Sequence, residues 1–222
     1  MRKTLPVLYE DNHLLVVNKP AGLATMGATS GTTTAVTLAA EYLKERYQKP
    51  GNVFVGVVSR LDRLVSGVLV LARTSKAASR LSEQFRDQTT DKRYMALVEG
   101  KWVAPDWLQL EDWVIKDEPR QRMRVAAENT LGAQLARLRV RAVAMHAPWT
   151  QLAIELQSGR KHQIRLQLAH RGHAILGDRK YDATSRFPHG IALHCQQLTL
   201  QHPTRKEPLT FMAPVPDYWP KA

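Results

Sequence analysis

The sequence predicts an α+β protein built on a mixed, largely antiparallel β-sheet with flanking helices. Two observations carry this prediction: many short runs rich in β-branched residues, and only a few segments with helical spacing, which do not alternate regularly with the strands. The chain has 222 residues, of which 44% are hydrophobic, so it can bury one substantial core. We therefore expect a single domain over residues 1–222, which can have two lobes.

The N-terminal part is expected to begin with a strand and a helix. The strand covers residues 13–18, and the turn over residues 19–22 ends it with a proline and a glycine. Residues 33–47 have helical spacing, and Pro50-Gly51 closes the segment. The side chains expected to face the core from this helix are Val36, Ala40, Leu43 and Tyr47.

Two strands and a second helix are expected next. The strands cover residues 53–58 and 67–72 and are separated by a polar loop. Thr74 is the expected N-cap of a helix that ends near Thr89, because its hydroxyl can accept a hydrogen bond from the first turn. The side chains expected on the buried side of this helix are Ala78, Leu81 and Phe85.

The second half of the chain is mostly strand, with one helix. Strands are expected over residues 93–98, 113–116, 122–126, 135–143, 150–156 and 191–200. The helix is expected to begin with Ser158 as its N-cap, and to bury Ile164 and Leu168. It is expected to end at Gly172, in the left-handed conformation that glycine tolerates.

Several classes of protein are excluded by composition. The apolar runs are short, as in residues 68–72, whereas a membrane span needs roughly 20 residues, and no signal-type stretch follows Met1. The single cysteine, Cys195, cannot build a disulfide framework or a cysteine zinc site. We expect a soluble, cytoplasmic protein with no membrane partner.

The charge of the chain indicates a polyanionic partner. Lys and Arg number 32 against 20 Asp and Glu, which leaves a formal net charge of +12. A field of this size attracts polyanions and speeds their encounter. Nucleic acid is therefore the expected partner, and a basic surface kept only for solubility is the alternative.

The polar loop between the strands over 53–58 and 67–72 presents a carboxylate among guanidinium groups. Asp62 is flanked by Arg60 and Arg63, which favour its ionised form. An ionised carboxylate in a cleft can act as a nucleophile, a base or a cation ligand. A salt-bridged carboxylate that only closes the turn is the structural alternative.

Two further segments place polar groups where a scaffold does not need them. Lys92 and Tyr94 point to the same side of a strand, where the tyrosine could stack on a base or simply pack at a rim. Lys161 and Arg165 are four residues apart and are expected on one helix face. Arg160 and the free N–H groups of the first helical turn would form an anion site suited to a phosphate.

Two other segments give weaker indications. His170 and His173 straddle the expected helix end without a matching cysteine or carboxylate set, so no metal site is expected. The Gly- and Thr-rich residues 27–33 lack the lysine of a phosphate-binding loop and are expected to form a flexible loop.

In their order and spacing, these segments resemble the motifs of the RluA-type pseudouridine synthases. The matching residues are 17–23, 60–62 with 66–67, 92–100, 159–165 with 172 and 177–178, and 193–195 with 202–203. The resemblance covers nearly the whole chain. It implies a member with the catalytic domain only, without the helical RNA-binding module that many relatives carry ahead of that domain.

The resemblance implies an isomerisation in RNA that needs no cofactor. The N1 glycosidic bond of a uridine breaks, the base rotates and a C5–C1′ bond forms. Asp62 matches the catalytic aspartate, Tyr94 the active-site tyrosine and Arg165 the arginine that pairs with this aspartate. Arg60 would occupy the base stack when the target is flipped out, and Leu193 would line the uracil pocket. Whether Asp62 acts as nucleophile at the sugar or the base, or as base at C2′, stays open.

The implied substrate is a stem-loop of ribosomal or transfer RNA, whose loop bases can be splayed out, bound by a monomer. The candidate RNA contacts are Arg60, Arg160, Lys161, Lys92 and Lys19. Three positions depart from the family pattern without removing a catalytic group: Ser59, Val65 and Gln167. Two other functions remain open: a catalytically inactive RNA-binding or ribosome-assembly protein with this fold, and a nuclease, which would need a cluster of metal-binding carboxylates.

Overall fold

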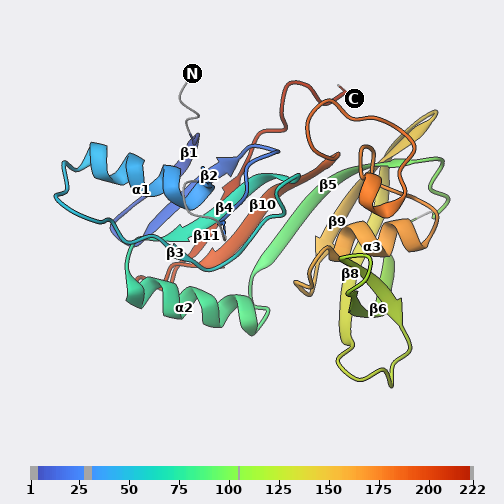
Figure 1. Ribbon diagram of the computed structural model, residues 1–222, viewed down its shortest axis with the longest axis horizontal. Coiled ribbons are helices and arrows are strands. Elements are labelled where there is room, and N and C mark those ends of the chain that lie inside the picture. Colours follow the sequence, from blue (N-terminus) through green and yellow to red (C-terminus); the bar gives the residue numbers. More distant parts are fainter. Residues whose placement is uncertain (1–4, 28–31, 105, 221–222) are drawn as a thin grey trace. The chain divides into compact units, whose positions relative to one another are not determined.

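The protein consists of strands and helices, and the chain divides into two compact units. A computed structural model describes residues 5–27, 32–104 and 106–220 (Figure 1). Unit 1 comprises residues 1–90 and 195–215, and unit 2 comprises residues 91–194 and 216–222. The predicted α+β class is confirmed. Residues 28–31, which belong to the expected flexible loop, lie outside the described residues.

In unit 1 the strands lie in the order β1, β2, β4, β10, β11, with the short β3 also paired to β4; the pairs β1–β2, β2–β4, β3–β4 and β10–β11 are antiparallel. The strands are β1 (Val7–Glu10), β2 (Leu14–Lys19), β3 (Gly56–Val57), β4 (Ser66–Ala72), β10 (Leu193–Gln201) and β11 (Pro208–Met212). Every residue of β4 is buried, as expected for an apolar strand with neighbours on both sides. β4 therefore forms the centre of this unit.

Two helices complete unit 1, and both begin at a threonine. α1 (Ala35–Arg46) has a capping box between Thr34 and Thr37, and α2 (Ser75–Arg86) has the predicted N-cap Thr74. The predicted buried faces are only partly correct. The residues that the helices bury are Ala35, Ala39 and Leu43 in α1, and Ala77 and Leu81 in α2.

The buried face of α1 differs from the prediction because Tyr47 has a polar partner. Its hydroxyl donates to Glu10 at 2.6 Å, and the hydroxyl of Tyr42 donates to the same carboxylate at 2.8 Å. The side chain of Tyr47 is therefore 46% exposed instead of buried. Tyr47 follows the last residue of α1 as its C-cap, and its hydrogen bond to Glu10 keeps it out of the core.

The predicted strand over residues 53–58 is reduced to β3. Only Gly56 and Val57 pair with β4, opposite Ala72 and Leu71, and Phe54 is 51% exposed. A Cβ on Gly56 would lie 2.9 Å from that of Ala78, so the close approach of α2 to β3 requires a glycine here.

Gly67 is the second position where only glycine fits. Its φ is +116°, and a Cβ would overlap the backbone of Cys195. Ser66-Gly67 therefore allows the first residues of β4 to approach β10 closely. This explains physically why a glycine follows the loop that carries Asp62.

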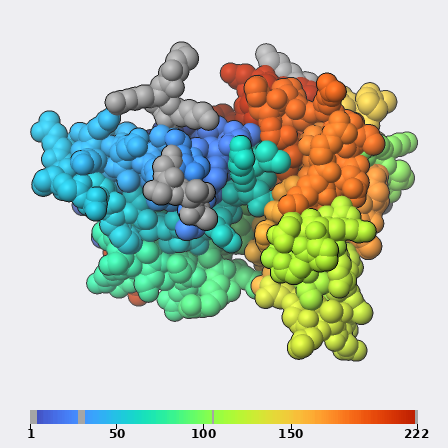
Figure 2. All heavy atoms as spheres, viewed as in Figure 1, coloured from blue at the N-terminus to red at the C-terminus, as the bar shows by residue number. Residues whose placement is uncertain are grey.

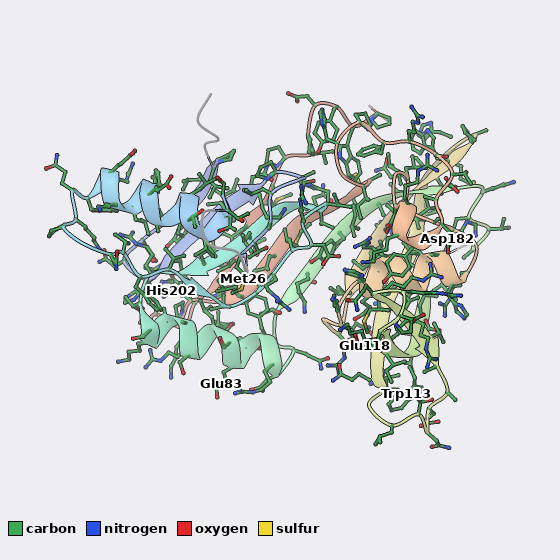
Figure 3. All side chains as sticks on the ribbon, viewed as in Figure 1. Met26, Glu83, Trp113, Glu118, Asp182 and His202 are labelled. Atoms are coloured by element: carbon green, nitrogen blue, oxygen red, sulfur yellow. The ribbon has the colours of Figure 1, made fainter. Side chains whose placement is uncertain are left out.

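The turn between β1 and β2 is tied to the segment after β10 by one carboxylate. Asp11 accepts hydrogen bonds from the backbone N–H groups of His13 and Leu14 at 2.7 and 2.8 Å. It also accepts from the hydroxyl of Tyr9 and from Nε2 of His202, both at 2.8 Å (Figure 3). Burial by itself raises the pKa of Asp11, but these hydrogen bonds lower it to about 2.

The stability of the protein should fall as the pH drops through the acid range, in part because of Asp11. A carboxyl with a pKa of about 3.8 unfolded and about 2 folded stabilises fully above pH 4, and the stabilisation is lost toward pH 2. The expected contribution is about 2 kcal/mol. Urea unfolding at pH 6 and pH 2.5 measures it. The variant Asp11→Asn should lose stability at pH 6 and show a smaller loss between the two pH values; an equal loss in both proteins would contradict the assignment.

Unit 2 is an antiparallel sheet in the order β5, β9, β8, β6, β7. The strands are β5 (Asp91–Glu99), β6 (Leu108–Asp117), β7 (Arg122–Ala126), β8 (Gln134–His146) and β9 (Trp149–Leu156). α3 (Gln163–His170) and the short 3-10 helix η1 (Arg179–Tyr181) lie on one face of this sheet, in orange in Figures 1 and 2. A core cluster joins them to the strands through Val114, Ala136, Leu166 and Tyr181.

α3 begins later than predicted. Ser158 is not its N-cap. Its hydroxyl accepts a hydrogen bond from the N–H of Arg137 at 2.8 Å and donates one to Oε1 of Gln163 at 2.9 Å, so it joins β8 to the first residue of α3. The helix begins at Gln163 after His162, whose φ is +53°. The prediction that Ile164 and Leu168 are buried is confirmed, and Gly172 has the predicted left-handed conformation with φ +80°.

Among the described residues, none of the helices is both long enough and apolar enough to cross a bilayer.

Candidate active site

Asp62 lies in the loop between β3 and β4 of unit 1. Its side chain is half-buried, whereas Arg60 and Arg63 on either side are exposed. The N–H of Val65 donates to the carbonyl of Asp62 at 3.0 Å and closes a tight turn that begins at the carboxylate. The loop therefore presents a carboxylate at the edge of the buried core.

The backbone around Asp62 is held by the segment that follows β2. The hydroxyl of Thr25 donates to the carbonyl of Leu61 at 2.9 Å and accepts from the N–H of the same residue at 3.2 Å. On the other side, the N–H of Gly22 donates to the carbonyl of Arg63 at 2.8 Å, and Nε of Arg63 donates back to the carbonyl of Gly22 at 3.2 Å. Hydrogen bonds on both sides of Asp62 fix its position.

Lys19 supports this loop from inside, and the prediction that it contacts RNA is wrong. Its side chain is 0% exposed, and Nζ donates to the carbonyls of Pro20, Leu23 and Arg63 at 2.9, 2.7 and 3.4 Å. Burial lowers the pKa of Lys19 to about 7, and the nearby charge of Asp62 opposes this shift. A buried ammonium that joins three carbonyls has a structural role.

Three further predicted site residues belong to β5 and to the start of β10, in unit 2. Tyr94 lies in β5 opposite Ile154 of β9 and is half-buried. Leu193, at the start of β10, is 3% exposed, as an apolar pocket lining requires. Lys92 is only 8% exposed, so it does not belong to an open basic surface. Tyr94 and Lys92 lie on the same side of the strand, as predicted.

Arg165 is held by a carboxylate that sequence reasoning did not assign to the site. Its Nε and Nη2 donate to the two oxygens of Asp178 at 2.6 and 2.7 Å, and the two side chains are 4% and 1% exposed. The guanidinium also lies 5.0 Å from the ring centre of Tyr181. A bidentate pair of this geometry fixes the plane of the guanidinium.

The hydroxyl of Tyr181 anchors this cluster to both the sheet and the turn before α3. It accepts from the N–H of Met123 at 3.0 Å and lies 2.9 Å from Nδ1 of His162. Since the hydroxyl already accepts from Met123, it can donate its own hydrogen to Nδ1. This contact joins the side chain of His162, whose φ is +53°, to Tyr181.

The predicted anion site at the start of α3 is not formed as expected. Lys161 lies in the turn before the helix and is exposed, whereas Arg165 is buried, so the two do not share a face. The N–H of Arg160 donates to Oε1 of Gln163 at 3.0 Å, and its Nε donates to the carbonyl of Leu135 at 3.0 Å. The late helix start explains both differences.

The three departures from the family pattern fit their surroundings. Gln167 is 0% exposed; its Nε2 donates to Asp112 at 2.8 Å and its Oε1 accepts from Gln163 at 3.0 Å. Val65 is 3% exposed, and Ser59 is half-buried. In residues 5–27, 32–104 and 106–220, no group of three or more His, Cys, Asp or Glu side chains could hold a metal ion.

The structure thus groups the predicted residues in two sets. Unit 1 holds Asp62 in a fixed loop above Lys19, with Arg60 exposed beside it. Unit 2 holds a half-buried tyrosine, Tyr94, and a guanidinium, Arg165, whose orientation Asp178 fixes. The chemistry available is a positioned carboxylate, an aromatic hydroxyl and a fixed cation.

Comparison with known proteins gives a consistent result. A family model described as RNA pseudouridylate synthase matches residues 13–170. Ribosomal large subunit pseudouridine synthase D of Xylella fastidiosa is 34% identical over 96% of this chain and 66% of its own length. Ribosomal large subunit pseudouridine synthase C of Vibrio cholerae is 34% identical over 94% of this chain and 65% of its own length. The chain thus spans about two thirds of the length of such relatives.

A solved structure supports the fold assignment. Human RNA pseudouridylate synthase domain containing 4 superposes with a TM-score of 0.79 at 22% sequence identity, covering 96% of this chain and 89% of that chain. At this identity the likeness concerns the fold alone.

Proposed function

This chain belongs to the RNA pseudouridylate synthase family, and from this premise we propose that it isomerises uridine to pseudouridine in ribosomal RNA. The relatives named above are ribosomal large subunit pseudouridine synthases. The formal net charge of +12 suits a large polyanionic substrate. The proposal includes a stem-loop as the target, a monomer as the active form and the cytoplasm as the place of action.

The observation that carries the proposal is the held loop of Asp62. Enzymes need a reactive carboxylate in a fixed position, and here hydrogen bonds fix the backbone at Leu61 and at Arg63. A protein that bound RNA only through its basic surface would not require this arrangement. Asp62 is accordingly the group that attacks the sugar or the base, or that removes the proton at C2′.

The other residues have roles that follow from their chemistry. Tyr94 stacks on the flipped uracil and assists loss of the C5 proton, and Arg165 contributes a fixed positive charge to the reaction. Leu193 lines the uracil pocket, and Arg60 fills the space that the base leaves. Lys161 and Arg160 contact the RNA backbone.

The test is release of tritium from RNA that carries uridine labelled at C5. Replacing the C5–H bond by the C5–C1′ bond must release the label, whatever the order of the steps. We expect release from ribosomal RNA, with pseudouridine in the digested product. Release from transfer RNA alone would mean that the substrate is transfer RNA and not ribosomal RNA. Tight binding of both RNAs without release would favour the inactive RNA-binding protein instead.

A further inference from the structure

One face of the unit 2 sheet carries a row of arginines. In β8, Ala136, Leu138 and Val140 are buried, and Ala136 belongs to the cluster with α3 and η1. Because side chains alternate along a strand, Arg137, Arg139 and Arg141 point to the opposite face. We call these three residues together with Trp107, which packs against two of them, the arginine face.

Trp107 organises the arginine face. The guanidinium carbons of Arg139 and Arg141 lie 5.1 and 5.2 Å from the centre of its indole ring. Contacts of this kind hold flexible arginine side chains in one orientation. The result is a set of flat groups, one indole and two guanidiniums, at the surface of a rigid strand pair. Trp113, which follows in β6, lies on the same face (Figure 3).

The charge of the arginine face is only partly compensated. Arg137 pairs with Glu111 at 3.3 Å and Arg139 with Glu155 at 3.4 Å, and both arginine side chains remain 50% and 43% exposed. Exposed pairs of this length contribute little and exchange readily with other anions. In the part of the chain that the structure describes, Arg141 has no carboxylate partner.

The arginine face and Tyr94 lie on opposite faces of one sheet. Tyr94 is opposite Ile154, and Ile154 is opposite Val140, so all three share the face that α3 covers. An RNA segment on the arginine face is therefore not the segment whose base stacks on Tyr94. Any ligand here would bind in addition to the target loop.

We propose that the arginine face binds a single-stranded segment of the substrate RNA outside the target loop. Guanidiniums pair with phosphates and stack on bases, and the indole adds a further stacking surface. The guanidinium charge of Arg141, which no carboxylate compensates in the part of the chain that the structure describes, favours a polyanion over a protein partner. The proposal rests on RNA being the substrate, and it adds a second contact surface to that function.

The experiment compares two hairpin RNAs, one blunt and one with a ten-nucleotide single-stranded tail, by fluorescence anisotropy over a range of salt. The double variant Arg139→Ala/Arg141→Ala removes two charges from the arginine face. The control Lys76→Ala/Arg86→Ala removes two charges from exposed positions on α2 of unit 1. A third variant, Trp107→Ala, tests the stacking group. Thermal unfolding verifies that each variant is folded.

We expect the tail to increase the affinity of the wild-type protein about tenfold, and we expect the double variant to show no such increase. Its log–log salt slope should be smaller by about 1.4, at about 0.7 for each phosphate that the variant no longer neutralises. The double variant should still bind the blunt hairpin like the wild type. Equal effects in the control variant, or a tail effect that survives in Arg139→Ala/Arg141→Ala, would overturn the proposal.

The two proposals fail separately. Tail binding that requires Arg139 and Arg141, with no tritium release from any RNA, would contradict the isomerase activity and support the arginine face. Tritium release from a blunt hairpin, with a tail effect that these arginines do not influence, would support the isomerase and contradict the arginine face.

Discussion

The variant Asp62→Asn is expected to lose tritium release by at least about a thousandfold while binding RNA within a few fold of the wild type. Asparagine has the shape of aspartate but can act neither as a nucleophile nor as a base in this reaction. The loop should keep its conformation, because the hydrogen bonds from Thr25 and Gly22 involve the backbone of Leu61 and Arg63. The loss should therefore appear in kcat.

The matched control for this variant is Asp87→Asn. Asp87 lies at the end of α2 in the same unit, with 52% of its side chain exposed, so the same chemical change is made away from the site. Its tritium release should equal that of the wild type. If Asp62→Asn keeps more than a tenth of the wild-type rate, Asp62 is not the reacting group. If both variants lose activity equally, the effect is one of charge alone.

The strands in the centre of each unit could be predicted because their residues are apolar over several positions. β4 and β9 match the expected ranges to within one residue. The edge strand β7 also matches its expected range, whereas the edge strands β1 and β11 were not predicted. β1 has four residues, none fully buried, and a register shift between Val7 and Tyr9, so its sequence has no clear period. Strands of this kind are held by neighbours, which a sequence does not display.

The helix boundaries show where a local rule was overridden. Thr74 is an N-cap as predicted, because its hydroxyl has no stronger partner than the N–H of Ala77. Ser158 also has a hydroxyl that could cap a helix, but this hydroxyl accepts a hydrogen bond from the N–H of Arg137 in β8. α3 therefore begins only at Gln163. Competition from a neighbouring strand is a tertiary effect and decides between the two cases.

The candidate site was predictable as a set of residue types and not as a set of contacts. Asp62 is recognisable from its position between two strands and its flanking arginines. Lys19 was expected to contact RNA, but it is buried and donates to three carbonyls, one of which, that of Arg63, lies 44 residues away in the sequence. Asp178 was not assigned to the site, because 13 residues and the end of a helix separate it from Arg165.

Replacing Asp178 by alanine is expected to lower the free energy of unfolding by about 3–5 kcal/mol, because it removes the carboxylate that holds two nitrogens of a buried guanidinium. Asp178→Asn separates charge from shape and should still cost more than about 2 kcal/mol. Urea unfolding at pH 7 measures both. Asp182→Ala is the control: Asp182 also pairs with an arginine, Arg122 at 3.0 Å, but its side chain is 80% exposed (Figure 3), so its loss should cost less than about 1 kcal/mol.

A double-mutant cycle decides whether the cost of Asp178→Ala arises from Arg165. If the cost arises from the buried Arg165 guanidinium left without a carboxylate, Arg165→Met/Asp178→Ala should be more stable than Asp178→Ala alone. The double variant has no uncompensated guanidinium at this position. The double variant should still be inactive in the tritium assay, because the role proposed for Arg165 requires its guanidinium. Additive losses in the cycle would mean that Asp178 stabilises the turn around η1 independently of Arg165. Restored stability without restored activity would separate the structural role of the pair from the chemical role of its arginine.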